Sequence, residues 1–429
     1  MNVCMKFLGC RLNEAEQASW HRQFVQLGHQ VVMEPEDAHV IAVNTCAVTA
    51  EATRKSRKML RDLHRQNPSA KIVATGCYAT LAHEKIQEEL HVDMVVPNAQ
   101  KSEMAQKIAE TWGGDMPQFA KDPNAQPAFA QSRTRAFVKV QDGCRNQCSF
   151  CIVTQARGNE KSVPIQEVVQ EINHLHAHGQ QEVVLAGVHL GGYGSDINED
   201  LRSLLEGILK DTSIPRIRLG SLEPWDFPKG FLDLWDNPRL CPHLHLPLQS
   251  GSDSVLRRMI RRCTVAEYKE LVHLARAQNP NFHVTSDLIV GFPGETDAEF
   301  QETLTTIQEI AFGDMHIFAY SPRQGTPAAR MKNPLNKNQI KERVKIIHPI
   351  VQQMQQDFKR SQVGRSDEVL WEREVDLLEN GSILWQGYTK NYLRVQYHSQ
   401  TPKALFNQIT PVLLMSPLDI DGPLQVKFP

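Results

Sequence analysis

Three cysteines lie within eight residues of one another in the middle of the chain, at positions 144–151. They are Cys144, Cys148 and Cys151, in the spacing C-x3-C-x2-C. Four thiolates complete a structural zinc site or a saturated iron–sulfur cluster, whereas three thiolates leave one metal position open. An open iron on a [4Fe–4S] cluster binds a substrate or cosubstrate directly, which a saturated electron carrier does not do. The alternatives are a zinc knot and three cysteines that only pack.

Three other cysteines each follow a predicted strand. They are Cys10, Cys46 and Cys77, in the sequences KFLGC, AVNTC and VATGC. Because the strands of a parallel α/β sheet end at one edge, where ligands bind, we expect these thiols to converge on a second cluster with an open iron. The glycines before Cys10 and Cys77 would permit the tight backbone that such a loop needs. The alternative is three ordinary buried cysteines, since free cysteine is commonly buried.

Composition bounds the class of protein. The 429 residues exceed the roughly 250–300 at which one core stops growing, so we expect two or three domains. A net charge of −2 gives no indication of nucleic-acid binding. Without a signal peptide or an apolar run of about 18 residues, we expect a cytoplasmic protein with no membrane contact. Nine cysteines in such a chain favour reduced thiols and metal ligation over disulfides.

The predicted elements that position the cysteines fall into an α/β pattern. Over residues 1–112, strands and helices alternate, which predicts a parallel α/β sheet. The expected strands are Val3–Leu8, His39–Val43, Lys71–Ala74 and Asp93–Val96, and the expected helices are Asn13–Leu27, Ala50–Gln66 and Leu81–Leu90. Residues 113–133 are rich in Gly, Pro, Gln and Asn, which is typical of a linker.

Residues 134–361 show six further β/α units. Expected strands are Ala136–Val140, Glu182–Ala186, Arg216–Leu219, His243–Leu246, Val284–Val290 and Asp314–Ala319. Expected helices are Ile165–His178, Leu201–Lys210, Val265–Ala277, Ala298–Ile310 and Lys337–Arg360. A full barrel has eight units, so six predict an open, partial barrel. Residues 362–429 change to short strands with turn signals, which predicts a small all-β barrel; its expected strands are Val369–Glu374, Ile383–Thr389 and Leu393–Tyr397.

Several longer stretches carry a family resemblance. They are NTCAVTAEATRKSR (44–57), LAGVHLGGYG (185–194), CPHLHLPLQSGSD (241–253), DLIVGFPGET (287–296) and FAYSPRQGTPAARM (318–331). With the two cysteine sets, they resemble the methylthiotransferase family of radical S-adenosylmethionine (SAM) enzymes, in particular the branch that modifies N6-threonylcarbamoyladenosine in tRNA. The resemblance covers nearly the whole chain. It includes the family's domain order: an N-terminal domain, a radical SAM barrel and a C-terminal barrel of the TRAM type.

The resemblance implies a function. Two [4Fe–4S] clusters would be present, one on Cys144, Cys148 and Cys151 to cleave SAM, the other on the second cysteine set to supply sulfur. The product would be a 2-methylthio nucleoside in the anticodon stem-loop of tRNA. An external electron donor such as flavodoxin or ferredoxin would be needed, and we expect a monomer. The alternatives are methylthiolation of isopentenyladenosine or of a ribosomal-protein aspartate, and, outside enzymes, a non-catalytic metal or electron-transfer protein.

The resemblance also implies a set of SAM contacts. The set comprises Phe150, Arg157, Gly187, His189, Ser221, Glu223, Gln249, Ser250, Gly291 and Arg323. Within it, Phe150 would flank the adenine of SAM, Arg157 would neutralise its carboxylate, and Arg323 would face the substrate or SAM. Each of these side chains has a purely structural role as its alternative.

Two features bear on RNA. The predicted helix after Cys46 carries a basic run, which favours either tRNA phosphate contact or a solvated face; the run consists of Arg54, Lys55, Arg57, Lys58, Arg61 and Arg65. The sequence WQGYTKNYLRV (385–395) sets aromatic residues beside Lys390 and Arg394, which suits either RNA stacking or a barrel core. Residues 362–429 hold six basic against eight acidic residues, a poor electrostatic match for phosphates.

Overall fold

The computed structural model describes residues 1–113, 134–377, 382–399 and 405–429. Apart from residue 113, the predicted linker at 113–133 lies outside the described residues. The chain forms two compact units, each made of separate segments. The first comprises the described parts of Met1–Gln131, Asp142–Glu160 and Ser321–Ala329, and the second comprises those of Ser132–Gln141, Lys161–Tyr320 and Arg330–Pro429. Both sets of candidate cysteines therefore belong to the first unit.

The first unit contains a parallel sheet with the strand order β2-β1-β3-β4-β5 in the described chain. The strands are β1 (Asn2–Phe7), β2 (Gln30–Val32), β3 (Val40–Thr45), β4 (Lys71–Gly76) and β5 (Met94–Val96). The helices are α1 (Arg11–Gln26), α2 (Ala50–Gln66), α3 (Cys77–Leu81), α4 (His83–Glu89) and α5 (Met104–Trp112). The predicted α/β alternation is confirmed. The short edge strand β2 and the nine-residue α5 have no counterpart among the predicted elements.

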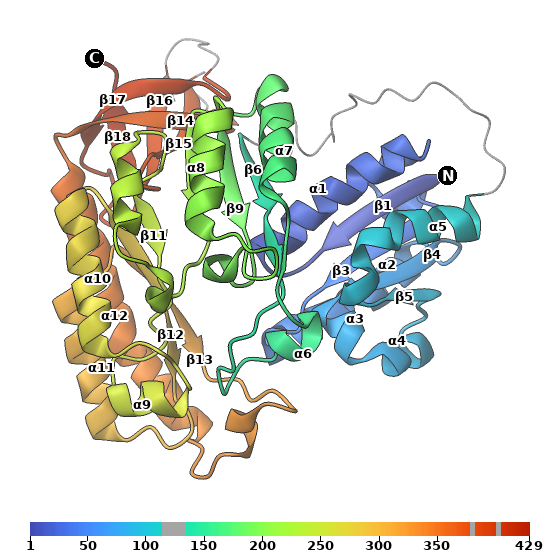
Figure 1. Ribbon diagram of the computed structural model, residues 1–429, viewed down its shortest axis with the longest axis horizontal. Helices are drawn as coiled ribbons and strands as arrows, with labels where there is room; N and C mark the ends of the chain where they lie inside the picture. The colour runs from blue at the N-terminus through green and yellow to red at the C-terminus, as the bar shows by residue number, and fades with distance from the viewer. Residues whose placement is uncertain (114–133, 378–381, 400–404) are drawn as a thin grey trace. The chain divides into compact units, whose positions relative to one another are not determined.

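Helices cover both faces of this sheet (Figure 1). Successive residues of a strand point to opposite faces, so β3 contributes to two cores. Ile41 and Val43 pack in the cluster that includes residues of α2 and α4, whereas Val40 and Ala42 pack with residues of α1 and α5. The buried, almost wholly apolar strands are typical of a parallel sheet covered on both sides. This packing fixes the edge at which the strands end.

The second unit contains six parallel strands in its described part, arranged as two three-stranded sheets, β10-β9-β6 and β11-β12-β13. Parallel bridges at Ile217–Leu240 and Ser221–His245 link the two sheets. The strands are β6 (Arg135–Lys139), β9 (Glu182–Ala186), β10 (Arg216–Leu219), β11 (His243–His245), β12 (His283–Val290) and β13 (Asp314–Ala319). A further short pair is β7 (Gln141–Asp142) with β8 (Lys161–Ser162). The predicted partial barrel is confirmed.

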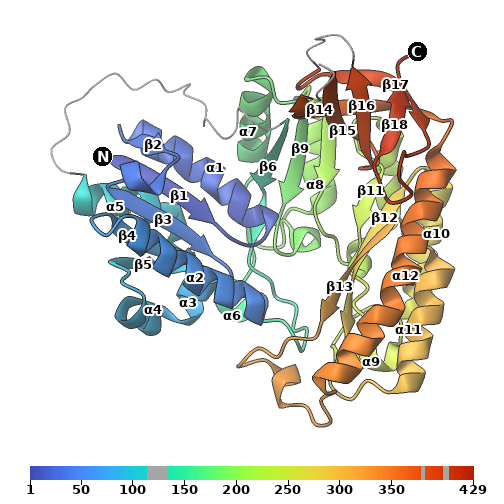
Figure 2. The ribbon, with the colours of Figure 1, turned by 180° about the vertical axis from the view of Figure 1, so that it is seen from behind.

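The described residues 134–362 contain the helices α6 (Val153–Arg157), α7 (Ile165–Ala177), α8 (Leu201–Asp211), α9 (Asp253–Arg258), α10 (Val265–Gln278), α11 (Asp297–Ile310) and α12 (Lys337–Gln362). Helix α6 belongs to the first unit and the others to the second. Helices α8, α10, α11 and α12 each begin at a residue whose side chain accepts a hydrogen bond from an N–H of the first turn. Capping boxes at Thr264 and Thr296 set the starts of α10 and α11. Figure 2 shows α10, α11 and α12 running beside one another along β11 to β13. Among the helices described, none is both long and apolar enough to cross a membrane.

The C-terminal segment forms a closed barrel with the order β14-β15-β16-β18-β17 among the described residues. Its strands are β14 (Ser366–Leu377), β15 (Ile383–Thr389), β16 (Arg394–Ser399), β17 (Ile409–Met415) and β18 (Leu424–Lys427). The predicted small barrel is confirmed. β17 and β18 have no predicted counterpart, because Pro411 interrupts the strand pattern of the first and the second has only four residues. The barrel core includes Trp371, Trp385 and Val395.

The aromatic residues considered for RNA stacking have partners inside the second unit. Trp385 is buried in the barrel core. Tyr388 and Tyr392 stack on each other with ring centroids 4.9 Å apart, and the guanidinium of Arg135 lies 4.3 Å from the centre of the Tyr388 ring. These contacts favour the barrel-core alternative for this stretch.

His283, the first residue of β12, is buried between the barrel and α12. Its Nδ1 donates a hydrogen bond of 2.9 Å to the carbonyl of Asn391, and its ring stacks on Phe358 at 4.5 Å. Burial lowers the pKa of His283 to about 4, whereas an unfolded histidine has a pKa of about 6.5. The stability that this neutral ring contributes is therefore complete above pH ~6.5 and is lost as the pH falls toward 4, by roughly 3 kcal/mol.

We expect His283→Asn, whose amide keeps a donor toward Asn391, to lose less stability than the wild type as the pH falls from about 6.5 to about 4.5. Thermal unfolding midpoints measured across this range would check it. His348→Asn, at an exposed position on α12, is the control and should follow the wild-type curve. Parallel curves for all three proteins would contradict the prediction.

Candidate metal centres

Cys10, Cys46 and Cys77 lie at the carboxyl ends of three neighbouring strands, β1, β3 and β4. Cys46 directly follows the last residue of β3 and Cys77 the last residue of β4, and these last residues, Thr45 and Gly76, are paired in register. Cys10 is the N-cap residue of α1, just beyond β1. We call this the cysteine edge. The predicted strand ends are thus side by side.

Glycines allow the cysteine edge its close approaches. Gly9 has φ +109° and Gly76 has φ +94°, and both values lie in a region that residues other than glycine rarely adopt. A Cβ on Gly9 would lie 2.9 Å from the Sγ of Cys46, and one on Gly76 would lie 2.2 Å from the carbonyl oxygen of Thr45. The prediction that glycine permits a tight backbone before Cys10 and Cys77 is confirmed.

Cys46 is held to the following helix by Ser56 of α2. Its N–H donates to the Ser56 hydroxyl at 3.0 Å, and the hydroxyl donates back to the Cys46 carbonyl at 3.0 Å. Burial raises the pKa of the Cys46 thiol, opposed by a backbone hydrogen bond from Val48 and by the charge of Arg157. Burial therefore favours the protonated thiol of Cys46 in the metal-free protein, and a metal ion that binds the sulfur would have to displace that proton.

The second cysteine set lies in a loop, residues 143–158, which we call the cysteine loop. The loop is closed by a hydrogen bond of 3.0 Å from the N–H of Cys144 to the carbonyl of Gly158. Backbone N–H groups point at two of its sulfurs, from Asn146 to Cys144 Sγ at 3.4 Å and from Val153 to Cys151 Sγ at 3.5 Å. Hydrogen bonds of this kind favour the thiolate form of cysteine.

Both sets fit a cluster in their donor chemistry. Within the described residues, no three His, Cys, Asp or Glu side chains are placed closely enough to share one metal ion. A single zinc ion needs every thiolate within about 2.3 Å of it. A [4Fe–4S] cluster binds each thiolate through a different iron, so its thiolates need not be close enough to share one ion. The partly exposed thiols of the cysteine loop, with N–H groups on their sulfurs, and the glycine-lined cysteine edge each offer three soft ligands.

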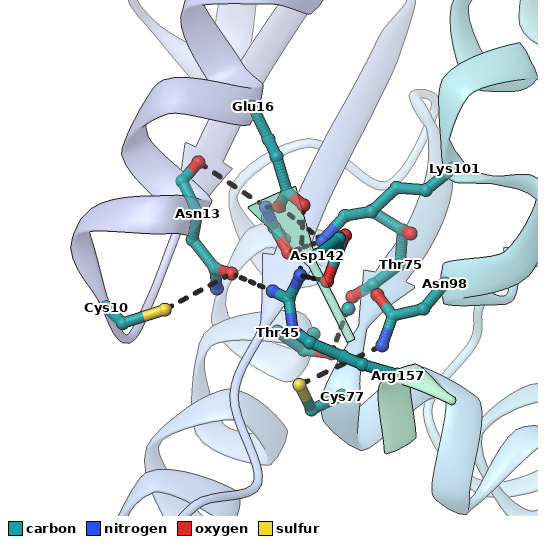
Figure 3. Close-up of polar contacts among 12 residues, drawn as sticks. Cys10, Asn13, Glu16, Thr45, Thr75, Cys77, Asn98, Lys101, Asp142 and Arg157 are labelled. Atoms are coloured by element: carbon teal, nitrogen blue, oxygen red, sulfur yellow. Dashed lines mark hydrogen bonds and ion pairs between the residues drawn. The ribbon is translucent and has the colours of Figure 1, made fainter. Parts of the chain in front are cut away.

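A buried charge network lies between the cysteine edge and α6 (Figure 3). We define it as Glu16, Lys101, Asp142 and Arg157. The Arg157 guanidinium contacts Glu16 at 3.1 Å and Asp142 at 2.8 Å, and Lys101 Nζ lies 2.5 Å from the other oxygen of Glu16. The side chains of Arg157, Glu16 and Lys101 are at most 4% exposed. Burial disfavours a charged Arg157, but its carboxylate neighbours outweigh this and raise its pKa.

Two asparagines extend this network to the thiols. Asn13 accepts a hydrogen bond of 2.8 Å from Arg157, and its Oδ1 lies 3.9 Å from Cys10 Sγ. Asn98 Nδ2 lies 3.8 Å from Cys77 Sγ and donates to the carbonyl of Ala156 at 2.7 Å. Helix α6, which follows Cys151, is therefore attached to the cysteine edge at two points. The predicted contact of Arg157 with the SAM carboxylate stays a prediction, and here its partners are protein carboxylates.

Arg323 belongs to the segment Ser321–Ala329 of the first unit. Its Nη2 donates to Thr53 Oγ1 at 3.0 Å, while its buried Nε has no hydrogen-bond partner among the described residues. Burial lowers the pKa of Arg323, and the neighbouring Cys46 opposes the shift. Arg323 therefore lies at the cysteine edge with one donor group to spare. Phe150, in the cysteine loop, is half-buried.

The other predicted SAM contacts lie at the carboxyl ends of strands in the second unit. After β9, the N–H groups of Val188 and His189 both donate to Gln141 Oε1 at 2.9 Å, beside Gly187, and His189 Nε2 lies 2.9 Å from Asp226. The structure thus fixes the backbone of this turn through a glutamine side chain that the sequence did not single out.

The remaining members follow β10, β11 and β12. Ser221 is exposed, and Glu223 pairs with Arg261 through Oε1 at 3.1 Å. Gln249 has a positive φ of +71° and Ser250 is buried. Gly291 donates its N–H to Glu295 at 2.9 Å. These residues follow the carboxyl ends of strands in the second unit, and their contact with SAM, which the family resemblance implies, stays a prediction.

Sequence reasoning missed several residues that support the thiols, namely Asn13, Glu16, Ser56, Asn98 and Lys101. Of these residues, only Asn13 could have been noticed in the sequence. It lies three residues after the N-cap residue Cys10, a position from which a polar side chain can hydrogen-bond to the cap. The others come from distant parts of the sequence and meet only in the fold.

Two family profiles match the chain. That of the radical SAM superfamily matches residues 138–307, and one described as uncharacterized protein family UPF0004 matches residues 2–97. Among solved structures, the radical SAM methyltransferase TsrM from Kitasatospora setae, with cobalamin and a [4Fe–4S] cluster bound, aligns with a TM-score of 0.58 and 15% identity, over 76% of this chain and 77% of that chain. Fold and profile together define a radical SAM protein.

Curated relatives narrow the class. The threonylcarbamoyladenosine tRNA methylthiotransferase MtaB of Thermotoga maritima is 35% identical over 92% of this chain and 91% of its own length. MtaB of Aquifex aeolicus is also 35% identical, over 92% of this chain and 96% of its own length. The tRNA-2-methylthio-N(6)-dimethylallyladenosine synthase of Bacillus thuringiensis is 33% identical, over 94% of this chain and 81% of its own length. The chain belongs to the radical SAM methylthiotransferase family and is an enzyme, a transferase, so a non-catalytic metal or electron-transfer protein is excluded.

We expect Glu16→Gln to destabilise the first unit by about 3–5 kcal/mol, because it leaves Lys101 and Arg157 buried without their shared charge. Urea unfolding, with the protease sensitivity of the first unit as the signal, would measure this loss of stability. Glu84→Gln, at an exposed position on α4, is the matched control and should change stability by less than about 0.5 kcal/mol. Equal unfolding of the two variants would show that the network contributes nothing.

Proposed function

We propose that this transferase adds a methylthio group to C2 of N6-threonylcarbamoyladenosine next to the anticodon of tRNA. The observation that carries the proposal is the presence of two three-cysteine sets in one compact unit, joined through Arg157, Asn13 and Asn98. The MtaB relatives support threonylcarbamoyladenosine as the substrate. Their 35% identity exceeds that of the dimethylallyladenosine synthase by only two percentage points, so the substrate needs a direct test.

The reaction explains why two sets are needed. The C2–H bond of adenine is neither acidic nor easily displaced, so acid–base groups alone do not activate it and a cofactor must supply the reactive species. We assign one [4Fe–4S] cluster with SAM to the cysteine loop and a second to the cysteine edge; when bound, they supply a carbon radical and transferable sulfur, respectively. Methylation would use another SAM.

The protein's own part is binding and positioning. The network at Arg157 and the Asn98 bond to Ala156 would keep the cysteine loop at a fixed place relative to Cys10 and Cys77. The spare Nε of Arg323 beside Cys46 would hold a polar group of the substrate or of SAM. A donor such as flavodoxin or ferredoxin, a monomeric state and action in the cytoplasm, where tRNA is found, complete the proposal.

Removing each cysteine set should separate the two activities. A variant with Cys10, Cys46 and Cys77 all changed to Ala should keep about four of about eight irons, the content of one of two [4Fe–4S] clusters, and should still cleave SAM while adding no sulfur. The variant C144A/C148A/C151A should lose SAM cleavage. Iron analysis and detection of 5′-deoxyadenosine would check both.

Cys4, buried within β1, gives the control for these variants. Cys4→Ala should retain both the iron content and the methylthio product. Full iron content in the first triple variant, or 5′-deoxyadenosine from the second, would contradict the assignment.

Deleting the gene should remove 2-methylthio-N6-threonylcarbamoyladenosine from tRNA and leave its unmodified precursor. Nucleoside mass spectrometry of tRNA, and peptide mass spectrometry of ribosomal proteins, with and without the gene restored, would measure this. Loss of the methylthio form of isopentenyladenosine, or of a modified ribosomal-protein aspartate, would instead identify one of the sister activities. Unchanged spectra for all three would refute the proposed function.

A further inference from the structure

One face of α2 forms a basic groove with a volume of about 750 Å³. Its cationic lining consists of Arg54, Arg57, Lys58, Arg61 and Arg65. These residues are three or four positions apart, which places them along one stripe of the helix. His64 and His91 stack on each other at 4.5 Å at one end of the groove.

The positive charge of this groove is only partly balanced. In the described chain, each nearby carboxylate serves two cations: Glu51 with Arg54 and Lys55, Asp62 with Lys58 and Arg65, and Glu89 with Arg57 and Lys85. Arg61 has no carboxylate partner among the described residues. Exposed pairs of this kind are weak, so the cations are free to exchange their partners for a bound anion.

The groove begins beside the cysteine edge. Helix α2 starts four residues after Cys46, and Thr53 in its first turns both lines the groove and accepts the hydrogen bond of Arg323. From there the helix runs for 17 residues, about 25 Å at 1.5 Å per residue. A strand of nucleic acid advances by about 3.4 Å per phosphate along a duplex, so several phosphates fit along the groove.

We propose that this groove binds the phosphodiester backbone of the tRNA whose adenosine reaches the cysteine edge. The inference rests on the proposed function and adds where the RNA is held. Arginine predominates in the lining, and its planar guanidinium matches phosphate oxygens in pairs. The C-terminal barrel segment, with six basic and eight acidic residues, offers no comparable surplus of positive charge. The occupant is RNA; an acidic redox protein is the competing outcome of the test.

The test compares two triple variants of the full chain. R57Q/R61Q/R65Q neutralises one stripe of α2, and K337Q/K341Q/K345Q neutralises an exposed stripe of α12 as the matched control. Fluorescence anisotropy with a labelled whole tRNA that lacks the methylthio group would give the affinity at several salt concentrations. Iron content and the thermal midpoint of each variant would verify folding.

We expect the α2 variant to bind tRNA at least tenfold more weakly and the control less than twofold. Each phosphate contact contributes about 0.7 to 0.9 to the slope of log affinity against log salt, so three lost contacts should lower that slope by about 2 to 3. Wild-type affinity and slope in the α2 variant would overturn the inference. If the α2 variant binds tRNA normally but flavodoxin reduces it more slowly than the wild type, the groove binds an acidic protein instead.

The outcomes separate this inference from the proposed function. If the wild type modifies tRNA and the α2 variant binds it normally, only the groove assignment fails. If the α2 variant loses RNA affinity and the wild type forms no methylthio nucleoside, the groove is an RNA surface and the proposed function fails.

Discussion

Glu16 is the residue on which the arrangement of the first unit depends. It places a carboxylate between Lys101 and Arg157 in a nearly dry environment, where each charge is costly without its partner. Arg157 lies near the end of the cysteine loop and Lys101 shortly before α5. The carboxylate of Glu16 on α1 therefore holds together parts of the chain that are about 140 residues apart in sequence. A network whose members are all paired has few alternative arrangements, so it fixes the spacing between the cysteine loop and the cysteine edge.

Much of this architecture could be predicted from residue pattern. The six barrel strands could be predicted because short strand-like runs alternate with helical patterns along residues 134–361, and the cysteine edge followed from strand-end position alone. The network could not be predicted, because Glu16 and Lys101 look like ordinary polar residues of helices until the fold brings them together. β17 was missed because Pro411 interrupts its strand pattern, and β18 was missed because its four residues are too few for an alternation to show.

The site residues divide along the same lines. Gly187 and Gly291, whose SAM contacts the family resemblance implies, lie after strands β9 and β12 as expected, since topology decides their position. Arg157 shows the limit of motif reasoning: its place a few residues after Cys151 is plain in the sequence, but its pairing with the carboxylates of Glu16 and Asp142 is not. The α2 cations were visible as a run, yet only the fold shows that their helix starts beside Cys46.

The first unit is assembled from three separate stretches of chain, the last of which ends at Ala329. Ribosomes deliver a chain from its N-terminus at about 5–20 residues per second, so Cys10, Cys46 and Cys77 emerge well before their later neighbours Arg157 and Arg323. During synthesis these thiols therefore exist for many seconds before the later segments of the first unit have been made. The first unit can therefore complete its fold only after Ala329 has left the ribosome, so the three thiols wait through most of synthesis before both of these arginines are present.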